Sequence, residues 1–126
     1  MKNRLALIFL ALLSIALGQE YLKTELHKDW TMRIVKGPTI DEEKKTKIYK
    51  TSIPTTVHLD LLAANDIPDP FLKENYPTVK WVSDCDYLYT TNFTISDEIA
   101  KYAHQKITFE GIDTYAEVTL NGKKIL

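Results

Sequence analysis

The stretch Ile107-Thr-Phe-Glu-Gly-Ile-Asp-Thr-Tyr-Ala-Glu-Val-Thr-Leu-Asn-Gly122 decides the fold class of this chain. Apolar residues alternate with polar ones in both of its halves: Ile107 and Phe109, then Ala116, Val118 and Leu120. A period of two is typical of β-strands that bury one face against another layer. Asn121-Gly122 predicts a type I′ turn, because both central residues of such a turn need positive φ. The stretch therefore predicts two strands and a hairpin whose return strand begins at Lys123, so close to the last residue that we expect an incomplete sheet.

Three earlier segments alternate in the same way, and one segment has a helical period. Strands are predicted over residues 30–35, 48–53 and 87–95. Residues 57–65 place apolar side chains at helical spacing, with Thr55 or Thr56 as the N-terminal cap and Asn65 at the end. Short strands joined by turns, with one short helix, predict an all-β fold, an antiparallel β-sandwich.

The connecting segments are predicted from their charge and their prolines. Residues 41–47 carry charges of both signs and are predicted to form a solvated loop. Residues 79–82 are predicted to be extended. In Ile67-Pro-Asp-Pro-Phe71, each proline fixes its own φ and favours an extended residue before it. This predicts a stiff loop that displays Asp69 and buries Phe71, and it leaves a structural and a ligand-facing role for Asp69 both open.

The first 18 residues have the pattern of a secretory signal peptide. Lys2 and Arg4 precede an apolar run, which ends in the small residues of a cleavage site at Ala16-Leu17-Gly18. The alternative, a membrane anchor, is disfavoured because a spanning helix needs about 20 apolar residues. We therefore expect a signal peptide over residues 1–18, one partial sandwich domain over residues 19–126, and no membrane attachment after cleavage.

Charge and cysteine content exclude several classes of protein. Sixteen basic and 17 acidic residues give a formal net charge of −1, so the chain lacks the basic surplus of a nucleic-acid-binding protein. Cys85 is the one cysteine, so no disulfide framework holds the chain together and a packed core must do so. We interpret Cys85 as a buried small residue rather than a nucleophile.

The residues taken alone contain no complete catalytic, metal-binding or cofactor-binding arrangement. The histidines are too far apart in the sequence for metal-ligand spacing: His27, His58 and His104. There is no glycine-rich phosphate loop and no nucleophile motif. Asp60 is predicted to lie on the solvated face of the helix. Asn92-Phe93-Thr94 is an acceptor sequence for N-glycosylation, with Asn92 on the polar side of its strand.

Four segments together resemble the N-terminal sugar-binding-like domain of lysosomal-type β-mannosidases in glycoside hydrolase family 2. They are Thr55-Thr-Val-His-Leu-Asp-Leu-Leu62, Ile67-Pro-Asp-Pro-Phe71, Trp81-Val82 with Asp86-Tyr-Leu-Tyr89, and Phe109-Glu-Gly-Ile-Asp-Thr-Tyr-Ala-Glu-Val-Thr-Leu-Asn-Gly122. The last segment is shared across the larger family, whereas the first two resemble β-mannosidases in particular. The resemblance covers residues 29–126.

This resemblance implies a jelly-roll-like, galactose-binding-like sandwich at the start of a multidomain enzyme. The enzyme removes terminal non-reducing β-D-mannose from oligosaccharides with retention of configuration, using two glutamates of a downstream barrel. No residue of this chain matches either glutamate, so the chain alone is expected to be inactive and to need no cofactor. Asp69 is the one candidate for a position near substrate. The secretory route implies a lysosomal or extracellular protein.

A second interpretation stays open from the sequence. A secreted sandwich of this kind could bind glycans without hydrolysing them. The unpaired return strand after Asn121-Gly122 argues against a sandwich that stands alone, because an open sheet edge invites aggregation.

Overall fold

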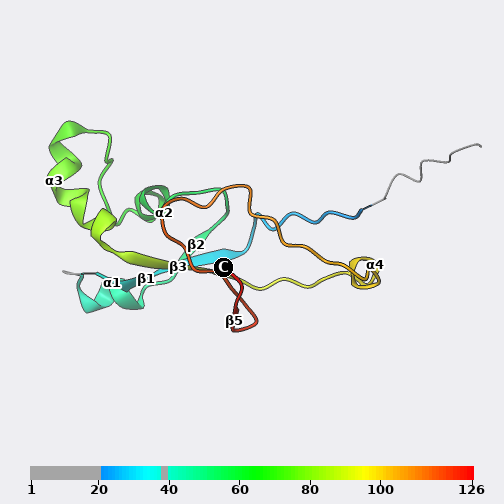
Figure 1. Ribbon diagram of the computed structural model, residues 1–126. Coiled ribbons are helices and arrows are strands. Elements are labelled where there is room, and N and C mark those ends of the chain that lie inside the picture. Colours follow the sequence, from blue (N-terminus) through cyan, green and yellow to red (C-terminus); the bar gives the residue numbers. More distant parts are fainter. Residues whose placement is uncertain (1–20, 38–39) are drawn as a thin grey trace, which may run out of the picture.

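A three-stranded antiparallel sheet and a separate two-stranded hairpin make up the strands of the described part of the chain (Figure 1). The computed structural model describes residues 21–37 and 40–126, so the predicted signal peptide lies outside the described residues. In chain order the elements are β1 (Trp30–Lys36), α1 (Glu42–Thr46), β2 (Tyr49–Thr51), α2 (Val57–Ala63), η1 (Lys73–Asn75), α3 (Tyr76–Val79), η2 (Lys80–Asp84), β3 (Asp86–Thr91), α4 (Asp97–Ala100), β4 (Thr119–Leu120) and β5 (Lys123–Lys124).

The sheet has the order β2-β1-β3 and confirms three predicted strands, although β3 ends at Thr91, four residues before the predicted end at Ile95. Trp30 in the central strand pairs with Thr51 on one side and with Thr91 on the other. Along β1, Met32 and Ile34 are buried while Arg33 is exposed. The period of two seen in the sequence therefore marks a sheet with one covered face.

Helix α2 covers that face. Its N-terminal cap is Thr56, whose hydroxyl oxygen accepts a hydrogen bond from Leu59 N at 3.4 Å. The helix ends at Ala63, and Ala64 is its C-terminal cap. Asn65 follows with a positive φ of 57°, a conformation that asparagine tolerates better than most residues. Leu61 is fully buried, in one cluster with residues of β1, β2 and the 67–82 segment: Met32, Tyr49, Leu61, Ile67, Val79 and Val82.

The segment 79–82 was predicted to be extended, and that prediction is wrong. It runs from the end of α3 into η2. Val79 and Val82 are both buried and Lys80 between them is exposed. In a strand, residues three apart point to opposite faces, whereas in a helical turn they share one face. The core needs both valines, so packing selects the helical turn.

The prediction of a loop over residues 41–47 is also wrong, because α1 forms there. Asp41 caps the helix by accepting a hydrogen bond from Lys44 N at 2.9 Å. Glu42 and Glu43 lie in the first turn and basic residues in the last, the arrangement that the helix dipole favours. No residue of α1 is buried, so its solvated character was predicted correctly although its backbone was not. The single predicted helix also understates the six short helical elements of the described residues.

The C-terminal segment departs furthest from the prediction. No strand forms over residues 107–110, where Ile107 and Phe109 are 38% and 44% exposed. The predicted turn is confirmed, with φ of 50° at Asn121 and 76° at Gly122. Backbone hydrogen bonds between Val118 and the last two residues extend the hairpin. A strand needs a hydrogen-bonded neighbour as well as an alternating pattern, and residues 107–110 find none among the described strands.

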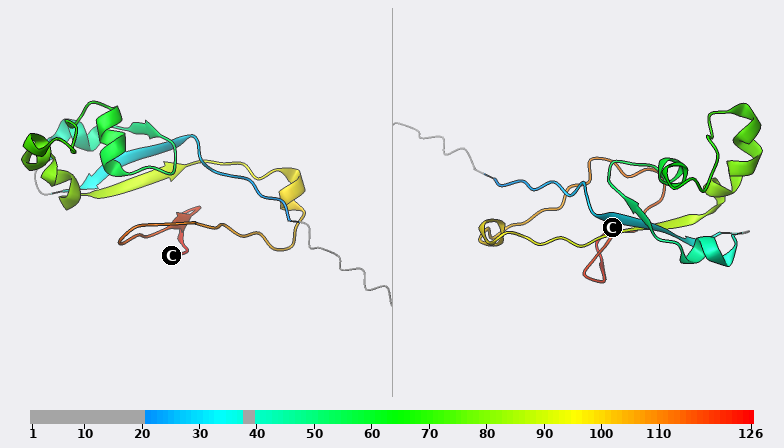
Figure 2. Two further views of the ribbon diagram at one scale, coloured as in Figure 1. Left: turned by 90° about the horizontal axis from the view of Figure 1, so that it is seen from above. Right: turned by 180° about the vertical axis from the view of Figure 1, so that it is seen from behind.

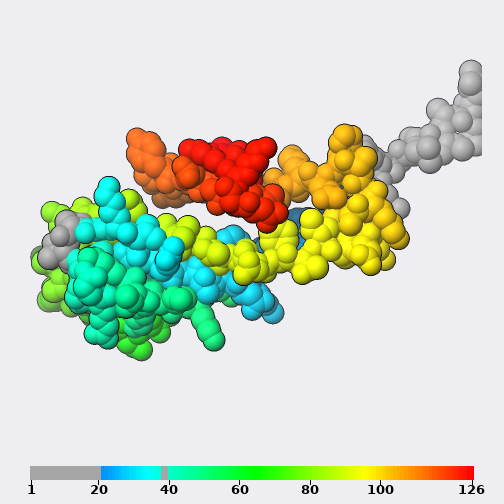
Figure 3. Space-filling view, turned by 90° about the horizontal axis from the view of Figure 1, so that it is seen from below, coloured from blue at the N-terminus to red at the C-terminus, as the bar shows by residue number. Residues whose placement is uncertain are grey.

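Helix α2 and the C-terminal hairpin lie on opposite sides of the sheet. The left view of Figure 2 shows α2 on one side of β1 and β3, and the C-terminal hairpin on the other. In Figure 3 the C-terminal residues run alongside the sheet, with open space between the two over much of their length. Within residues 21–37 and 40–126, no helix has the length and apolar composition needed to span a membrane.

Candidate functional site

Asp60 is the one buried charged residue among those described, at 7% exposure. The prediction of a solvated position for it is wrong. Its Oδ1 accepts hydrogen bonds from Thr51 Oγ1 at 2.5 Å and Thr55 Oγ1 at 2.9 Å, and its Oδ2 accepts one from Tyr89 OH at 2.7 Å. Val57 and Ala64, three residues before and four after Asp60, both pack against the core, so Asp60 shares the helix face that they occupy. The carboxylate thereby joins α2 to β2 and β3.

The hydroxyl groups around Asp60 act as fixed donors. Burial raises the pKa of Tyr89, and the hydrogen bond to Asp60 raises it further, so this phenol stays protonated and donating well above neutral pH. Hydrogen bonds to an ionised acceptor are shorter and stronger than neutral ones. With three donors committed to it, Asp60 is suited to holding α2 on the sheet. A general acid or base must instead reach a substrate proton.

A second carboxylate, Asp66, lies just beyond the end of α2. It accepts hydrogen bonds from Lys47 Nζ at 2.7 and 2.8 Å and from Tyr49 OH at 2.6 Å. Burial pushes the pKa of Asp66 upward, but the hydrogen bonds from Lys47 and Tyr49 outweigh it and leave the pKa below its ordinary value. Burial and the bond to Asp66 raise the pKa of Tyr49. Asp66 thus ties α2 to β2, as Asp60 does.

Asp69 is exposed on its loop between the two prolines. Its Oδ1 accepts a hydrogen bond from Phe71 N at 2.9 Å, and its backbone oxygen accepts one from Asn75 Nδ2 at 2.9 Å. These bonds shape the turn that leads into η1. The predicted burial of Phe71 is wrong: the ring is 88% exposed. A position of Asp69 near substrate stays a prediction, and the observed contacts of Asp69 are local.

Cys85 is half-buried at the junction of η2 and β3. Its thiol donates a hydrogen bond to Trp81 O at 3.2 Å, and burial raises its pKa. A Cβ placed on Gly37 would lie 2.5 Å from Cys85 Sγ, so a larger residue there would require neighbouring side chains to move. A raised pKa leaves little thiolate at neutral pH, and the thiol therefore packs rather than reacts.

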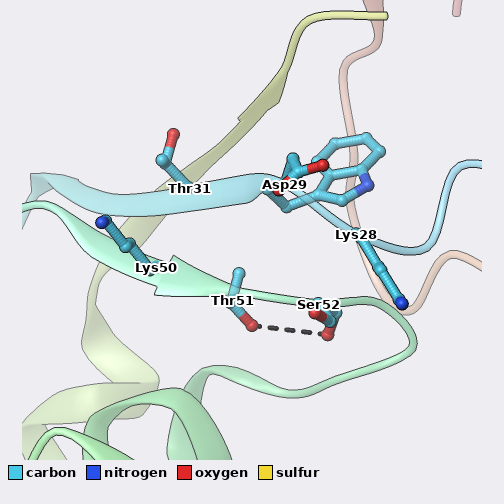
Figure 4. A pocket seen from close by; sticks show the side chains of 7 residues that line it. Lys28, Asp29, Thr31, Lys50, Thr51 and Ser52 are labelled. Carbon is cyan, nitrogen blue, oxygen red and sulfur yellow. Dashed lines mark hydrogen bonds between the residues drawn. The ribbon is translucent and has the colours of Figure 1, made fainter.

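A shallow hollow opens where β1 begins and β2 ends (Figure 4). Its lining contains two ammonium groups, one carboxylate, an indole and three hydroxyl-bearing residues: Lys28, Asp29, Trp30, Thr31, Lys50, Thr51 and Ser52. Several donors are already engaged, since Trp30 Nε1 donates to Leu26 O at 2.7 Å and Thr51 Oγ1 to Asp60. A second hollow, near α4, contains one carboxylate, Glu98. Glycoside hydrolysis needs two facing carboxylates, and each hollow has one.

The geometry of these residues does not identify a protein family, but comparison with known proteins does. Residues 30–126 match the model of a protein family described as the glycosyl hydrolase 2 galactose-binding domain-like family. The chain belongs to this family.

Its curated relatives are β-mannosidases. Beta-mannosidase B of Thermothelomyces thermophilus is 42% identical over 101 residues, which are 80% of this chain and 11% of that protein. Beta-mannosidase A of Emericella nidulans is 33% identical over 87 residues, or 69% of this chain and 9% of the relative. A probable beta-mannosidase of Caenorhabditis elegans is 31% identical over 75 residues, or 60% and 8%. The chain thus spans between 8% and 11% of the length of these relatives.

In this galactose-binding-like domain, the polar residues that the fold brings together tie helix to sheet. Within the described ranges, no group of three or more histidine, cysteine or acidic side chains is placed to hold a metal ion. Sequence reasoning missed Asp60, although a signal was present: it lies three residues after Val57 and one before Leu61, on the apolar side of the helix. Asp69 and Asn92, which the sequence singled out, are exposed, and neither is a hydrogen-bond partner of Asp60 or Asp66.

Proposed function

We propose that this chain is the N-terminal, non-catalytic domain of a β-mannosidase. The observation that carries the proposal is the 42% identity to a beta-mannosidase over 101 residues. The geometry supports a scaffold role, because both of the mostly buried carboxylates, Asp60 and Asp66, are held by neighbouring side chains. The proposed substrates are oligosaccharides with terminal non-reducing β-D-mannose, broken down in glycan catabolism.

The proposed chemistry belongs to a further part of a longer protein. A retaining glycosidase uses two carboxylates about 5–5.5 Å apart, one as nucleophile and one as acid and base. In the proposed enzyme these are two glutamates of a barrel domain, and the present domain supplies loops near the barrel mouth. The exposed Asp69 loop is the proposed contribution from this chain. No cofactor takes part in this mechanism.

The proposed complete domain is a jelly-roll sandwich in which further strands follow β5. Two exposed apolar residues of the C-terminal segment that alternate with polar ones support this arrangement: Ile107 and Phe109. Single exposed apolar residues are common on proteins, but an alternating row is typical of a face that another layer covers.

The proposed route is the secretory pathway, with a lysosomal or extracellular destination and no membrane attachment after cleavage. The support is the basic, apolar and small-residue order of residues 1–18. The near balance of charge disfavours nucleic acid as a partner.

The proposal is tested by extending the reading frame. The transcript is sequenced beyond codon 126, and the longer protein and the 126-residue chain are purified in parallel. We expect the longer protein to hydrolyse a chromogenic β-mannoside in preference to the matching β-galactoside, and the short chain to hydrolyse neither.

Two results would contradict the proposal. Turnover of the β-mannoside by the 126-residue chain would place catalysis within the domain itself. A stop codon after Leu126, together with a monodisperse chain that binds on a glycan array, would favour the non-catalytic glycan-binding protein instead.

A further inference from the structure

Asn92 lies at the first position beyond the ladder between β1 and β3. The last pair of that ladder is Trp30 with Thr91, and the chain then runs from β3 to α4 without regular structure (Figure 1). Of the asparagines in the sequence, Asn92 alone has serine or threonine two residues later, with a residue other than proline between. This is the acceptor pattern for an N-linked oligosaccharide.

The structure adds that both recognised side chains are accessible. Asn92 and Thr94 are exposed, and the neighbouring side chains that make hydrogen bonds are those of Thr91 and Ser96. Phe93 and Ile95 are exposed as well, at 38% and 43%. The whole 92–95 segment is therefore open to solvent beside the end of β3.

We propose that Asn92 carries an N-linked oligosaccharide. In this reaction the side-chain nitrogen of Asn92 forms a bond to the anomeric carbon of an oligosaccharide carried on a lipid diphosphate. The amide loses one proton and the lipid diphosphate leaves, with no change of oxidation state. Because the sugar is bulky and hydrated, the modification also assigns this end of β3 to the solvent-facing surface of the mature protein.

The inference rests on the proposed secretory route, and the experiment separates the two. The full chain with its own N-terminus is expressed in eukaryotic cells with a C-terminal extension that carries an independent acceptor sequence. Peptide N-glycosidase digestion, which converts a glycosylated asparagine to aspartate, is followed by mass spectrometry of the peptides. We expect conversion at both Asn92 and the extension.

Matched variants then identify the acceptor. The chain with glycans on both Asn92 and the extension should run more slowly on a gel than the chain with one glycan. Asn92→Gln and Thr94→Ala should each abolish the slower band completely. Thr94→Ser should retain that band, because serine keeps the hydroxyl that the pattern requires.

The outcomes distinguish the inference from the route. A glycan on the extension with none on Asn92 overturns the inference and leaves the secretory route intact. A chain with no glycan at either position overturns both. If Asn92→Gln still carries a glycan in addition to the one on the extension, the assignment to Asn92 is overturned, since another residue would then carry the sugar.

Discussion

Strand β1 and the segment around residues 107–110 carry the same alternating pattern, but the apolar side chains are buried only in β1. Met32 and Ile34 in β1 are at most 2% exposed, whereas Ile107 and Phe109 keep more than a third of their surfaces in solvent. Strand β1 has a hydrogen-bonded neighbour on both sides and α2 over one face. The later segment has neither among the described residues. The comparison teaches that alternation identifies the face to be buried, while burial itself requires a partner.

The two regions also differ in their polar contacts. In the body formed by β1, β2, β3 and α2, Asp60 and Asp66 each join elements distant in sequence. In the C-terminal segment, Glu117 pairs with Lys124 and Glu110 with Lys23, and both pairs lie on the exposed surface. Exposed pairs of this kind contribute little to stability. The body should therefore unfold as one cooperative unit, and the segment should contribute little to its stability.

The largest expected effect is that of Leu61→Ala in the body. Removing a fully buried leucine should lower the free energy of unfolding by about 2–5 kcal/mol, because transfer energy is lost and a cavity remains. Ile107→Ala is the matched change in the segment and should cost less than about 1 kcal/mol. Urea unfolding followed by circular dichroism measures both. Equal costs would show that the segment packs as tightly as the body.

Asp60→Asn should have the next largest effect, a loss of about 2 kcal/mol. The amide keeps one acceptor oxygen, but it brings an N–H group to a place where hydroxyl groups donate, and the charge is lost. Asp69→Asn makes the same chemical change at an exposed position and should cost within about 0.5 kcal/mol. Thermal unfolding of the two variants side by side tests the difference. A cost at Asp60 as small as that at Asp69 would contradict the role of Asp60 as the link between helix and sheet.

Asp66 should give the body a measurable sensitivity to acid. Its pKa in the folded chain lies below the ordinary value of 3.8, so the ionised side chain stabilises the fold above that pH. This contribution is lost as the pH falls from about 4 through the folded pKa. Asp66→Asn should remove about 1.5 kcal/mol at pH 7 and flatten the loss of stability below pH 4.

The control for this prediction is the partner of Asp66. Lys47→Gln should remove part of the same acid-sensitive stability, and the double variant should lose less than the sum of the two single losses. Urea midpoints measured between pH 7 and pH 2 provide the comparison. Full additivity of the two losses would mean that the pair is not coupled.

The smallest effect is expected in the hairpin. Gly122 has a φ of 76° with open space around it, so alanine there is strained by its backbone and should cost about 1 kcal/mol locally. Gly111→Ala also meets open space, without a positive φ, and serves as the control. Amide hydrogen exchange at Val118 and Ile125 reports on the hairpin bonds. Unchanged exchange in Gly122→Ala would contradict the I′ turn.

Local features were predictable from the sequence because neighbouring residues create them. The turn at Asn121-Gly122 needs only two residues that accept positive φ, and α2 needs only its cap and its helical spacing. The strand at residues 30–35 follows from a row of apolar side chains. The four resembling segments likewise identified the family, which the match over residues 30–126 confirms.

Only the tertiary structure decided what required contact between distant residues. The helical path of residues 79–82 depends on the core taking up both Val79 and Val82. The burial of Asp60 depends on hydroxyl groups of β2, the loop before α2, and β3 meeting at one point. The exposure of Ile107 and Phe109 depends on the absence of a neighbouring strand among the described residues. A sequence pattern states which face a segment can bury, and the free energy of burial is gained only where another surface arrives to exclude water.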